Sequence, residues 1–495
     1  MPELVEGPSF LSPWAEGREA GFDKLSQVGL GEHDGSDWTR YPPSMATAPF
    51  IPPHPPRGDG PVPVWRGFFG ERARNSIFGW SNRAFRIPHM KRRILGYTVH
   101  IPLTPDAVQH VLQTNAASYA KPDIVKRLLA PGIGRGLLTA DGQLWRDQRR
   151  IVAASFAPAA IDPLIPVFAR TAREIAKGWS SGGTQDLAEA ATTTTMTIIA
   201  DTLFGGDPRL KTKAALGHIA AALKATAEAR LTALLGLPTI GYNRVIREGQ
   251  RGREFFRRAL ADVVRDRLPD SGEQDFLGTL IRDLRAQYEP GEALMLAVDN
   301  AATFYLAGHE TTANAVTWTL YLLSEQPHWQ EAVAAEAQAA LGAGGEDAQL
   351  PDRLPLLRRV LDEALRLYPP VPRMDRQAVA TDAMNGFDVA PGDIISIWPW
   401  LLHRHQNLWD DPDAFDPDRW LPERRAGYHR FQYIPFGAGP RICVGMRFAQ
   451  VEALTVLAHW LAEWRLAPAS AREVRPVGTV TLRPERGLPL RLERR

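Results

Sequence analysis

The chain contains one cysteine, Cys443, and the residues around it favour metal-ligand chemistry. Residues 436–442 (FGAGPRI) precede it and Gly445 follows it; glycine and proline at these positions prevent regular structure and predict a loop. From Phe448 onwards, apolar residues recur at three-and-four spacing, which predicts a helix directly after the loop. Cys443 would then lie at a helix N-terminus, where the macrodipole and unpaired amides stabilise a thiolate. A lone cysteine is usually buried and inert, but a thiolate with no second cysteine to bridge indicates an axial metal ligand.

Two pairs of charged or aromatic residues have spacings at which their side chains can meet. Glu363 and Arg366 lie three residues apart beside an apolar helix face, so they can form an ion pair. Such pairs are common on protein surfaces and contribute little to stability. Trp145 and Arg149 lie four residues apart after residues 141–142 (DG), which predict a helix start. Taken alone, this second pair favours a cation–π contact.

A third candidate lies inside the longest predicted helix, from about Glu292 to Leu323. A helix of about 32 residues spans about 48 Å, which predicts that it crosses the core. Its middle carries the polar sequence AGHETT at residues 307–312. Glycine there costs roughly 0.5–1 kcal/mol relative to alanine, so these residues either form an exposed turn, as His309 and Thr312 allow, or serve a function.

The elements that must position these residues are mainly helices. Residues 105 to about 330 have the pattern of amphipathic helices broken by Gly and Pro, whereas residues 94–101, 479–482 and 488–492 predict short strands. Residues 1–60 are rich in Pro, Gly, Ser and acidic residues and predict a disordered leader with a stiff end. We therefore predict an α+β fold, mainly α with a minor β sheet, in one large domain over residues 61–495.

Composition excludes several classes of protein. The apolar fraction of 44% and charged fraction of 23% are ordinary for a globular protein, and the net charge of +2 gives no reason to expect nucleic-acid binding. One cysteine fits a reducing compartment. No stretch reaches the ~18 apolar residues of a transmembrane helix, and the N-terminus lacks the pattern of a secretory signal. We expect a cytoplasmic protein.

The cysteine loop resembles a known family. Five positions match, at identical spacing, the haem-binding loop of the cytochrome P450 superfamily, and the resemblance extends over roughly residues 60 to 490. It implies the cytochrome P450 fold as a single large haem domain, with haem b (iron protoporphyrin IX) as cofactor and Cys443 as the axial ligand of the iron. The matching positions are Phe436, Gly439, Arg441, Cys443 and Gly445.

The resemblance also implies a structural role for Glu363 and Arg366. The family has a Glu-x-x-Arg helix and, about fifty residues later, a Pro-x-Arg segment, to which Arg419 corresponds here. These three residues would form a buried charged network that braces the haem loop. Trp420 stands where the family usually has Phe.

Other residues are similar to those that bind the haem carboxylates. By the resemblance, Arg149, helped by Trp145, meets a propionate, and Arg376 and Arg441 do the same. Charge-assisted hydrogen bonds of this kind are strong ones. The resemblance thus implies that the cofactor is held by Trp145, Arg149, Gly308, Arg376, Phe436, Arg441, Cys443 and Gly445.

The AGHETT segment is similar to the family's distal-helix motif. There Gly308 would give room for dioxygen, while Glu310 and Thr311, as catalytic residues, would guide protons to it. Members that work as peroxygenases tend to lack this pair of an acid and an alcohol. The resemblance therefore implies a monooxygenase.

The implied reaction hydroxylates or epoxidises a lipophilic small molecule with dioxygen and with electrons that originate from NAD(P)H. One cysteine cannot ligate an iron–sulfur cluster, so electrons would come from a separate ferredoxin and ferredoxin reductase, or from a flavodoxin-type donor. Arg146, Arg150 and Arg447 would face this donor or be plain surface residues. We expect a monomer whose largely apolar pocket is formed by residues 118–138, 200–253, 302–311, 371–374 and 477–481.

Three alternatives remain open at this point. A haem-thiolate isomerase or dehydratase would need no electrons. A peroxygenase would use peroxide in place of dioxygen. A non-catalytic haem sensor would bind a ligand without turnover.

Overall fold

The computed structural model describes residues 49–60, 70–94, 96–229, 243–268 and 275–495, which all belong to one compact unit, Pro49–Arg495. This unit starts earlier than the boundary predicted at residues 60 and 61. The carbonyl oxygen of Pro53 accepts a hydrogen bond of 2.7 Å from the Tyr368 hydroxyl, and Arg57 donates to Asp413 over 2.7 Å. The prolines keep this segment extended, so its polar groups find partners on the domain. Residues 1–48 of the predicted leader lie outside the described residues.

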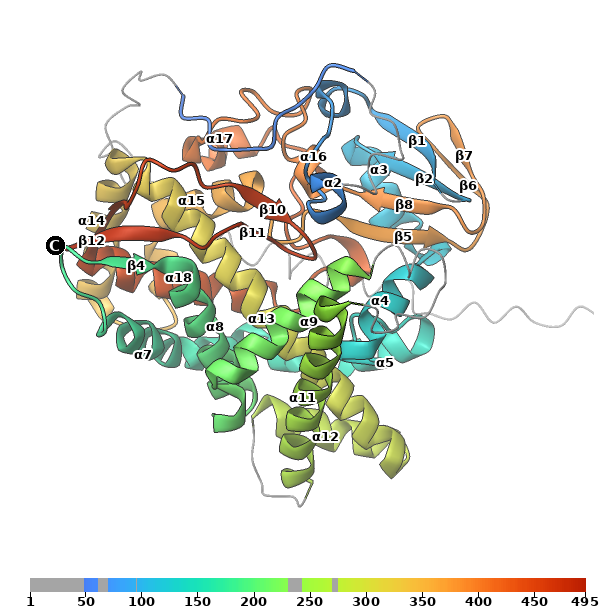
Figure 1. Ribbon diagram of the computed structural model, residues 1–495, viewed down its shortest axis with the longest axis horizontal. Helices are drawn as coiled ribbons and strands as arrows, with labels where there is room; N and C mark the ends of the chain where they lie inside the picture. The colour runs from blue at the N-terminus through green and yellow to red at the C-terminus, as the bar shows by residue number, and fades with distance from the viewer. Residues whose placement is uncertain (1–48, 61–69, 95, 230–242, 269–274) are drawn as a thin grey trace, which may run out of the picture. The chain divides into compact units, whose positions relative to one another are not determined.

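Helices make up most of this unit, which confirms the predicted fold class (Figure 1). Many begin with proline in the first turn, where its missing N–H costs no hydrogen bond. The α-helices are α2 (Glu71–Arg74), α3 (Pro105–Gln109), α4 (Asp123–Ile133), α5 (Gly142–Ala153), α6 (Pro158–Ile161), α7 (Ile165–Ala176), α8 (Leu187–Leu203), α9 (Lys213–Glu228), α11 (Arg244–Asp266), α12 (Phe276–Gln287), α13 (Pro290–Ser324), α14 (Pro327–Gly344), α15 (Pro355–Leu367), α16 (Pro399–Leu402), α17 (Pro422–Arg425) and α18 (Met446–Glu463).

Helix α13 is the central element of the helical part. Its 35 residues span about 52 Å at 1.5 Å per residue, so the predicted long helix is confirmed. It packs against α8, α11, α12, α15 and α18, which bury most of its side chains. A helix enclosed in this way is a rigid support for the polar residues in its middle.

The strands form a minor part of the fold. A five-stranded sheet has the order β1-β2-β8-β5-β3, in which only β2 and β8 run parallel, and Figure 1 shows it at one side of the unit with most helices at the other. A three-stranded sheet has the order β4-β12-β9, and β6-β7 and β10-β11 are hairpins. The strands are β1 (His89–Ile94), β2 (Tyr97–Pro102), β3 (Tyr119–Ala120), β4 (Thr184–Asp186), β5 (Met374–Ala378), β6 (Asp382–Met384), β7 (Phe387–Val389), β8 (Ile394–Ile397), β9 (Trp464–Pro468), β10 (Pro476–Gly478), β11 (Leu482–Pro484) and β12 (Pro489–Arg494).

Two strand predictions were wrong in detail. The strand predicted over residues 94–101 is split between β1 and β2, which pair as a hairpin around Gly96 with a φ of 86°. The strand predicted over residues 479–482 is mostly the turn between β10 and β11. Alternation of apolar residues does not show where a chain reverses, whereas the positive φ at Gly96 marks such a turn. The strand predicted over residues 488–492 corresponds to β12.

None of the described helices is by itself long and apolar enough to cross a membrane. One bent pair, residues 142–156 with residues 158–176, passes the same test by length and composition alone.

Candidate functional site

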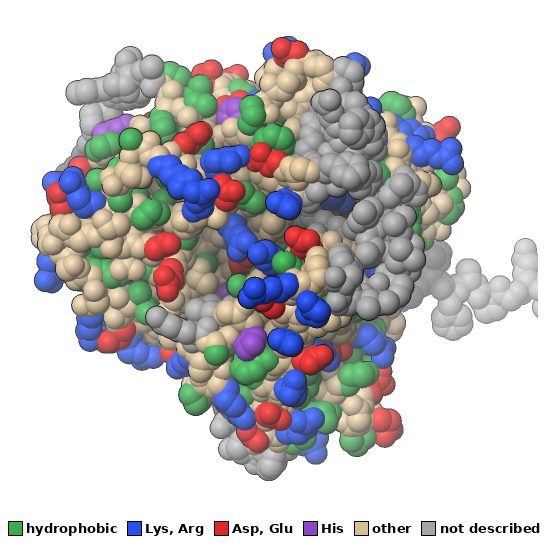
Figure 2. Space-filling model, viewed as in Figure 1, with side chains coloured by type: hydrophobic (Ala, Val, Ile, Leu, Met, Phe, Trp, Pro, Cys, Tyr) green, Lys and Arg blue, Asp and Glu red, His purple; other side chains and the backbone are tan. Residues whose placement is uncertain are grey.

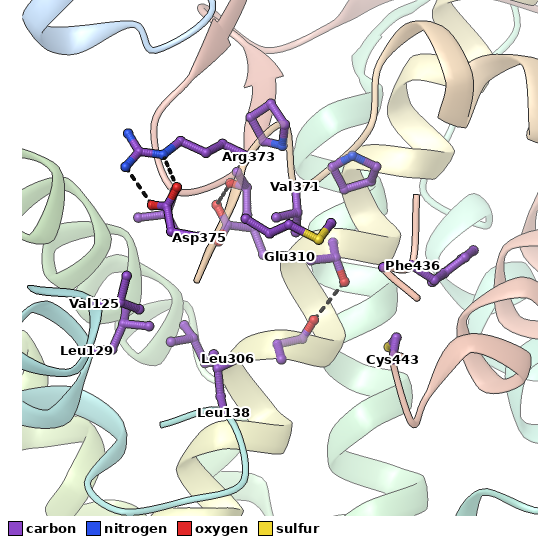
Figure 3. Close-up of a pocket in the computed structure, with 18 of the residues that line it drawn as sticks. Val125, Leu129, Leu138, Leu306, Glu310, Val371, Arg373, Asp375, Phe436 and Cys443 are labelled. Atoms are coloured by element: carbon purple, nitrogen blue, oxygen red, sulfur yellow. Dashed lines mark hydrogen bonds and ion pairs between the residues drawn. The ribbon is translucent and has the colours of Figure 1, made fainter. Parts of the chain in front are cut away.

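A cavity of about 1650 Å³ lies between α13, the loop that carries Cys443, and strands β5 and β8. Its walls are mainly apolar, and Figure 3 shows Leu129, Leu306 and Val371 directed into it from three different elements. All five segments predicted to line the pocket contribute residues to it. Ligand pockets usually measure roughly 300–1,000 Å³, so this cavity has room for a large cofactor together with a second molecule.

The loop that carries Cys443 is held in a defined shape. Gly439 has a φ of +67°, and a Cβ at this position would overlap the carbonyl oxygen of Leu112. The backbone N–H of Cys443 donates to the Phe436 carbonyl oxygen over 2.9 Å, and α18 begins three residues later at Met446. The thiol is thereby presented to the cavity from the start of a buried helix.

Burial and polar contacts act in opposite directions on the pKa of the thiol. Burial raises the pKa of Cys443, although the Gly445 N–H and the charge of Arg149 act in the opposite direction. The N–H at the start of α18 therefore favours the thiolate, as the sequence predicted, while burial disfavours it. A coordinated metal ion deprotonates a thiol outright, so bound iron would favour the thiolate further.

Four of the cationic side chains that line the cavity, which we call the inner cations, are Arg149, Arg376, Arg441 and Lys121. Burial and the neighbouring Arg441 lower the pKa of Arg376 to about 10. Burial, Arg376 and Arg441 lower the pKa of Lys121 to about 7. Asp141 pairs with Arg441, and the charges of Asp141 and Asp375 act on both Arg376 and Lys121. This excess of positive charge fits an anionic group with more than one carboxylate.

Trp145 contacts a different arginine from the one that its spacing in the sequence favours. The guanidinium of Arg441, not of Arg149, lies over the Trp145 ring, 4.4 Å from its centroid. Arg149 instead stands close enough to Cys443 for their charges to interact. Lys121 was missed in the sequence, where its only signal is the Lys-Pro step before α4, which keeps the chain extended at this point.

The site's residues fit haem b. In the described part of the chain no group of three or more His, Cys, Asp or Glu side chains is arranged to hold a metal ion. The lone thiol of Cys443 therefore needs the remaining iron ligands to come from the cofactor itself. The four cations fit the two propionates of such a cofactor, and the apolar walls fit its ring.

On α13, the structure places Glu310 and Thr311 at the cavity but does not bond them to each other. The Thr311 hydroxyl donates to the Ala307 carbonyl oxygen over 2.7 Å. Glu310 Oε1 accepts a hydrogen bond of 2.8 Å from the hydroxyl of Thr481, in the turn between β10 and β11. The sequence predicted Thr481 in the pocket lining but not its hydrogen bond to Glu310, because 171 residues separate these two residues.

The neighbours of this pair are buried, so the exposed-turn alternative was wrong. His309 and Thr312 are each only 2% exposed, and the hydroxyl of Thr195 on α8 donates to the His309 carbonyl oxygen over 2.8 Å. A Cβ at Gly308 would approach the side chain of Ile199 on α8 to 2.6 Å. Gly308 thus lines the cavity and also allows α13 to pack closely on α8.

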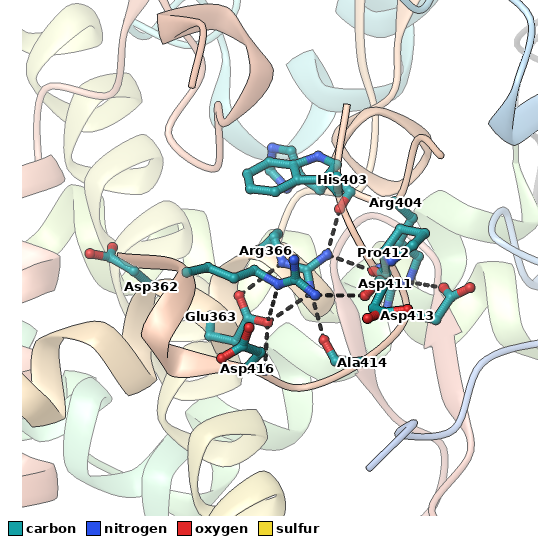
Figure 4. Close-up of polar contacts among 12 residues, drawn as sticks. Asp362, Glu363, Arg366, His403, Arg404, Asp411, Pro412, Asp413, Ala414 and Asp416 are labelled. Carbon is teal, nitrogen blue, oxygen red and sulfur yellow. Dashed lines mark hydrogen bonds and ion pairs between the residues drawn. The ribbon is translucent and has the colours of Figure 1, made fainter. Parts of the chain in front are cut away.

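Glu363, Arg366 and Arg419 form a buried network, so they are not a surface pair (Figure 4). The two carboxylate oxygens of Glu363 each accept a hydrogen bond of 2.8 Å from Arg366, and one accepts 3.3 Å from Arg419. The indole N–H of Trp420 also donates to Glu363, over 3.1 Å. Trp420, which differs from the family's usual residue, therefore adds a donor that Phe lacks.

The three arginines considered for partner docking lie on α5 and α18. Arg150 pairs with Asp147 at 2.8 Å and Arg447 with Asp162 at 2.7 Å, while Arg146 donates to the Gln143 side chain over 3.0 Å. Each thus has a partner on the protein itself. Their role toward an electron donor stays a prediction.

Comparison with known proteins gives a consistent result. The family model for cytochrome P450 matches residues 56–488. The chain is 32% identical to cyclooctatin synthase of Streptomyces melanosporofaciens over 383 residues, covering 76% of this chain and 83% of that protein. It is 30% identical to leukotriene-B4 omega-hydroxylase 3 of Mus musculus over 418 residues, covering 78% and 79% respectively. The solved cytochrome P450DA heme domain has the same fold, with a TM-score of 0.72 at 24% identity, covering 82% of this chain and 90% of that one.

The family model covers most of the chain, and the relatives that are 30% identical to this chain include a hydroxylase. The cavity, the thiol of Cys443 and the surrounding cations are what a haem-dependent enzyme needs. This chain belongs to the cytochrome P450 family and is a haem-dependent monooxygenase.

Proposed function

We propose that the protein hydroxylates or epoxidises a lipophilic small molecule bound in the cavity, with dioxygen and with electrons from a separate protein. One oxygen atom enters the substrate and the other leaves as water, which consumes two electrons and two protons. The observation that carries this proposal is an apolar cavity that Cys443, Glu310 and Thr311 all line. Figure 3 shows Cys443 and Glu310 on different elements around it.

The chain's own residues would hold the cofactor. Haem b, when bound, would supply the iron chemistry that activates dioxygen, and the thiolate of Cys443 would hold its iron. Arg149, Arg376 and Arg441 would bind its propionates, and we add Lys121 to this set. Trp145 would support Arg441 through the contact between its ring and the guanidinium. Gly308, Phe436 and Gly445 would complete the set of residues that contact the cofactor.

The remaining residues would exclude water and move protons. Apolar side chains such as Leu129, Leu306 and Val371 desolvate the substrate. Glu310 holds and releases a proton, and its position is set by the hydrogen bond from Thr481. The Thr311 hydroxyl donates to Ala307, so its oxygen keeps lone pairs for a hydrogen-bond donor in the cavity. Positioned proton donors typically contribute ~10²–10⁴-fold to a step that needs them.

Electron supply, compartment and assembly complete the proposal. The electrons would come from NAD(P)H through a ferredoxin and its reductase, or a flavodoxin-type donor, because a lone cysteine cannot bind an iron–sulfur cluster. We propose a cytoplasmic monomer, in line with the cysteine content and charge. The relatives' names, among them leukotriene-B4 omega-hydroxylase 3 and taurochenodeoxycholic 6 alpha-hydroxylase, agree with a lipophilic substrate.

The first test concerns the cofactor. The ferrous protein with carbon monoxide should show the strongly red-shifted Soret band of thiolate ligation, and Cys443→His should lose it. An unshifted band in folded, haem-loaded protein would contradict the assignment of Cys443.

The second test concerns the reaction. Lipophilic compounds that shift the Soret band are incubated with ¹⁸O-labelled dioxygen, NAD(P)H and a surrogate ferredoxin system. We expect a product carrying one labelled oxygen, formed only with electrons. Product without electrons would instead indicate an isomerase or dehydratase. Product only with added peroxide would indicate a peroxygenase, and binding with no product at all would indicate a sensor.

A further inference from the structure

The cavity extends from Cys443 to a rim of charged residues at the surface. Its lining includes Arg74 on α2, Lys224 on α9 and Arg483 on β11, and all three side chains are exposed. Figure 2 shows Lys and Arg side chains gathered around a hollow on the face where these elements lie. We call Arg74, Lys224 and Arg483 the cationic rim.

The cationic rim has more positive charge than its protein neighbours balance. Across residues 49–60, 70–94, 96–229, 243–268 and 275–495, none of the three makes an ion pair. Other exposed arginines do have carboxylate partners: Arg150 pairs with Asp147 and Arg265 with Asp262. Two carboxylates lie near Lys224: Glu228 lines the cavity at the end of α9, and Glu248, whose charge interacts with that of Lys224, already pairs with Arg244.

Two further charges at the cavity neutralise each other. Arg373 donates to both carboxylate oxygens of Asp375, over 2.8 and 2.5 Å. Figure 3 shows this pair on the side of the cavity away from Cys443. It therefore adds no net charge, and the surplus at the opening belongs to the cationic rim.

The wall between the rim and Cys443 is apolar. Leu223 lies on α9 beside Lys224, and Leu128, Leu129 and Leu306 also line the cavity. The inner cations fit the haem propionates, and the leucines of this wall offer no positive charge to a second anion. A ligand that satisfies both regions has an apolar body and an anionic group at one end.

We infer that the cationic rim binds the carboxylate of an amphipathic substrate, whose apolar body extends from the rim toward Cys443. This inference rests on the proposed monooxygenase function and names the substrate class. It also assigns the regiochemistry, because the oxidised carbon must lie at the Cys443 end of the cavity. Oxidation then occurs far from the carboxylate and not at the carbons next to it.

The inference is tested by matched pairs of acids and esters. The probes are palmitic acid with methyl palmitate and abietic acid with methyl abietate, titrated into the ferric holoprotein by Soret shift. Exposed ion pairs are weak, so two or three of them together correspond to about tenfold in affinity. We expect at least one acid to bind about tenfold more tightly than its ester, and added salt to weaken only the acid.

Variants assign the effect to these residues. The triple variant Arg74→Gln, Lys224→Gln, Arg483→Gln should remove the preference for the acid and leave the ester's dissociation constant unchanged. Arg265→Gln, which changes an exposed arginine of α11 outside the cavity lining, should behave as wild type. Each variant must keep the wild-type carbon monoxide spectrum, which excludes a general folding defect.

Several outcomes would overturn the inference. It fails if neither acid binds better than its ester, if the triple variant keeps the preference, or if the bound acid is oxidised next to its carboxylate. Failure of the proposed function itself looks different. In that case the red-shifted carbon monoxide band or the electron-dependent product is missing, whatever the preference between acid and ester.

Discussion

The buried network around Glu363 allows a graded test of what stabilises the haem loop. Glu363→Gln removes the negative charge and keeps the size of the side chain. Arg366 and Arg419 would then retain the carbonyl oxygens that they already contact, such as those of His403 and Asp411. Both guanidiniums would lose their only buried counter-charge among the described residues.

The expected magnitude follows from these contacts. Breaking a buried ion pair by removing one partner costs ~3–5 kcal/mol, because a desolvated charge is left without compensation. Trp420→Phe removes a single hydrogen bond to the same carboxylate and should cost ~1.5–3 kcal/mol. Glu254 pairs with Arg258 on the exposed face of α11 at 3.6 Å, so Glu254→Gln should cost at most about 0.5 kcal/mol.

The assay is urea unfolding of the holoprotein, followed by tryptophan fluorescence, together with haem content per chain. Since native proteins are stable by only ~5–15 kcal/mol, Glu363→Gln should also lower the yield of haem-loaded protein. Stability should fall in the order Glu254→Gln, Trp420→Phe, Glu363→Gln. If Glu363→Gln keeps wild-type stability and haem content, the network does not stabilise the loop and our reasoning is wrong.

Three more predictions follow from individual contacts. Thr311→Ala should leave substrate-induced spectral shifts intact but divert reducing equivalents from product to hydrogen peroxide. Thr319→Ala removes an equivalent helix hydrogen bond outside the cavity lining and should not cause this diversion. Equal product per NAD(P)H in both variants would refute the assignment of Thr311. Burial raises the pKa of Glu336 from 4.5 to about 7, so its contribution to stability is complete below about pH 4.5 and is lost as the pH rises through about 7. Glu336→Gln should remove that loss of about 3 kcal/mol, which unfolding at several pH values would detect. Lys121→Met should speed the transfer of haem to apomyoglobin by about tenfold or more, because a charged hydrogen bond to a propionate is lost; an unchanged rate would exclude Lys121 from the site.

Elements built from local hydrogen bonds were predictable. Pro290 and the apolar run after it define α13, and Gly445 followed by apolar residues at helical spacing defines α18. Chain reversals were harder to predict, as the turn between β10 and β11 shows. Its residues alternate like a strand, but the hairpin depends on cross-strand pairing, which no short segment encodes.

The partners of the site residues could not be read from spacing. Trp145 meets Arg441, almost three hundred residues away, and not the nearby Arg149. Glu310 is held by Thr481 and not by the adjacent Thr311. Spacing along a helix limits which neighbouring side chains can meet, but the packing of the whole domain decides which distant side chain makes the contact.

By itself, the sequence determined the family, the loop that carries Cys443 and the positions of the polar residues on α13, because these depend on local motifs at a fixed spacing. Only the tertiary structure decided that Trp420 donates to Glu363, that Lys121 joins the inner cations and that Arg74, Lys224 and Arg483 share one rim. The physical reason is that burial and long-range electrostatics depend on which elements pack together. Residues from α2, α9 and β11 become neighbours only when the whole domain has folded.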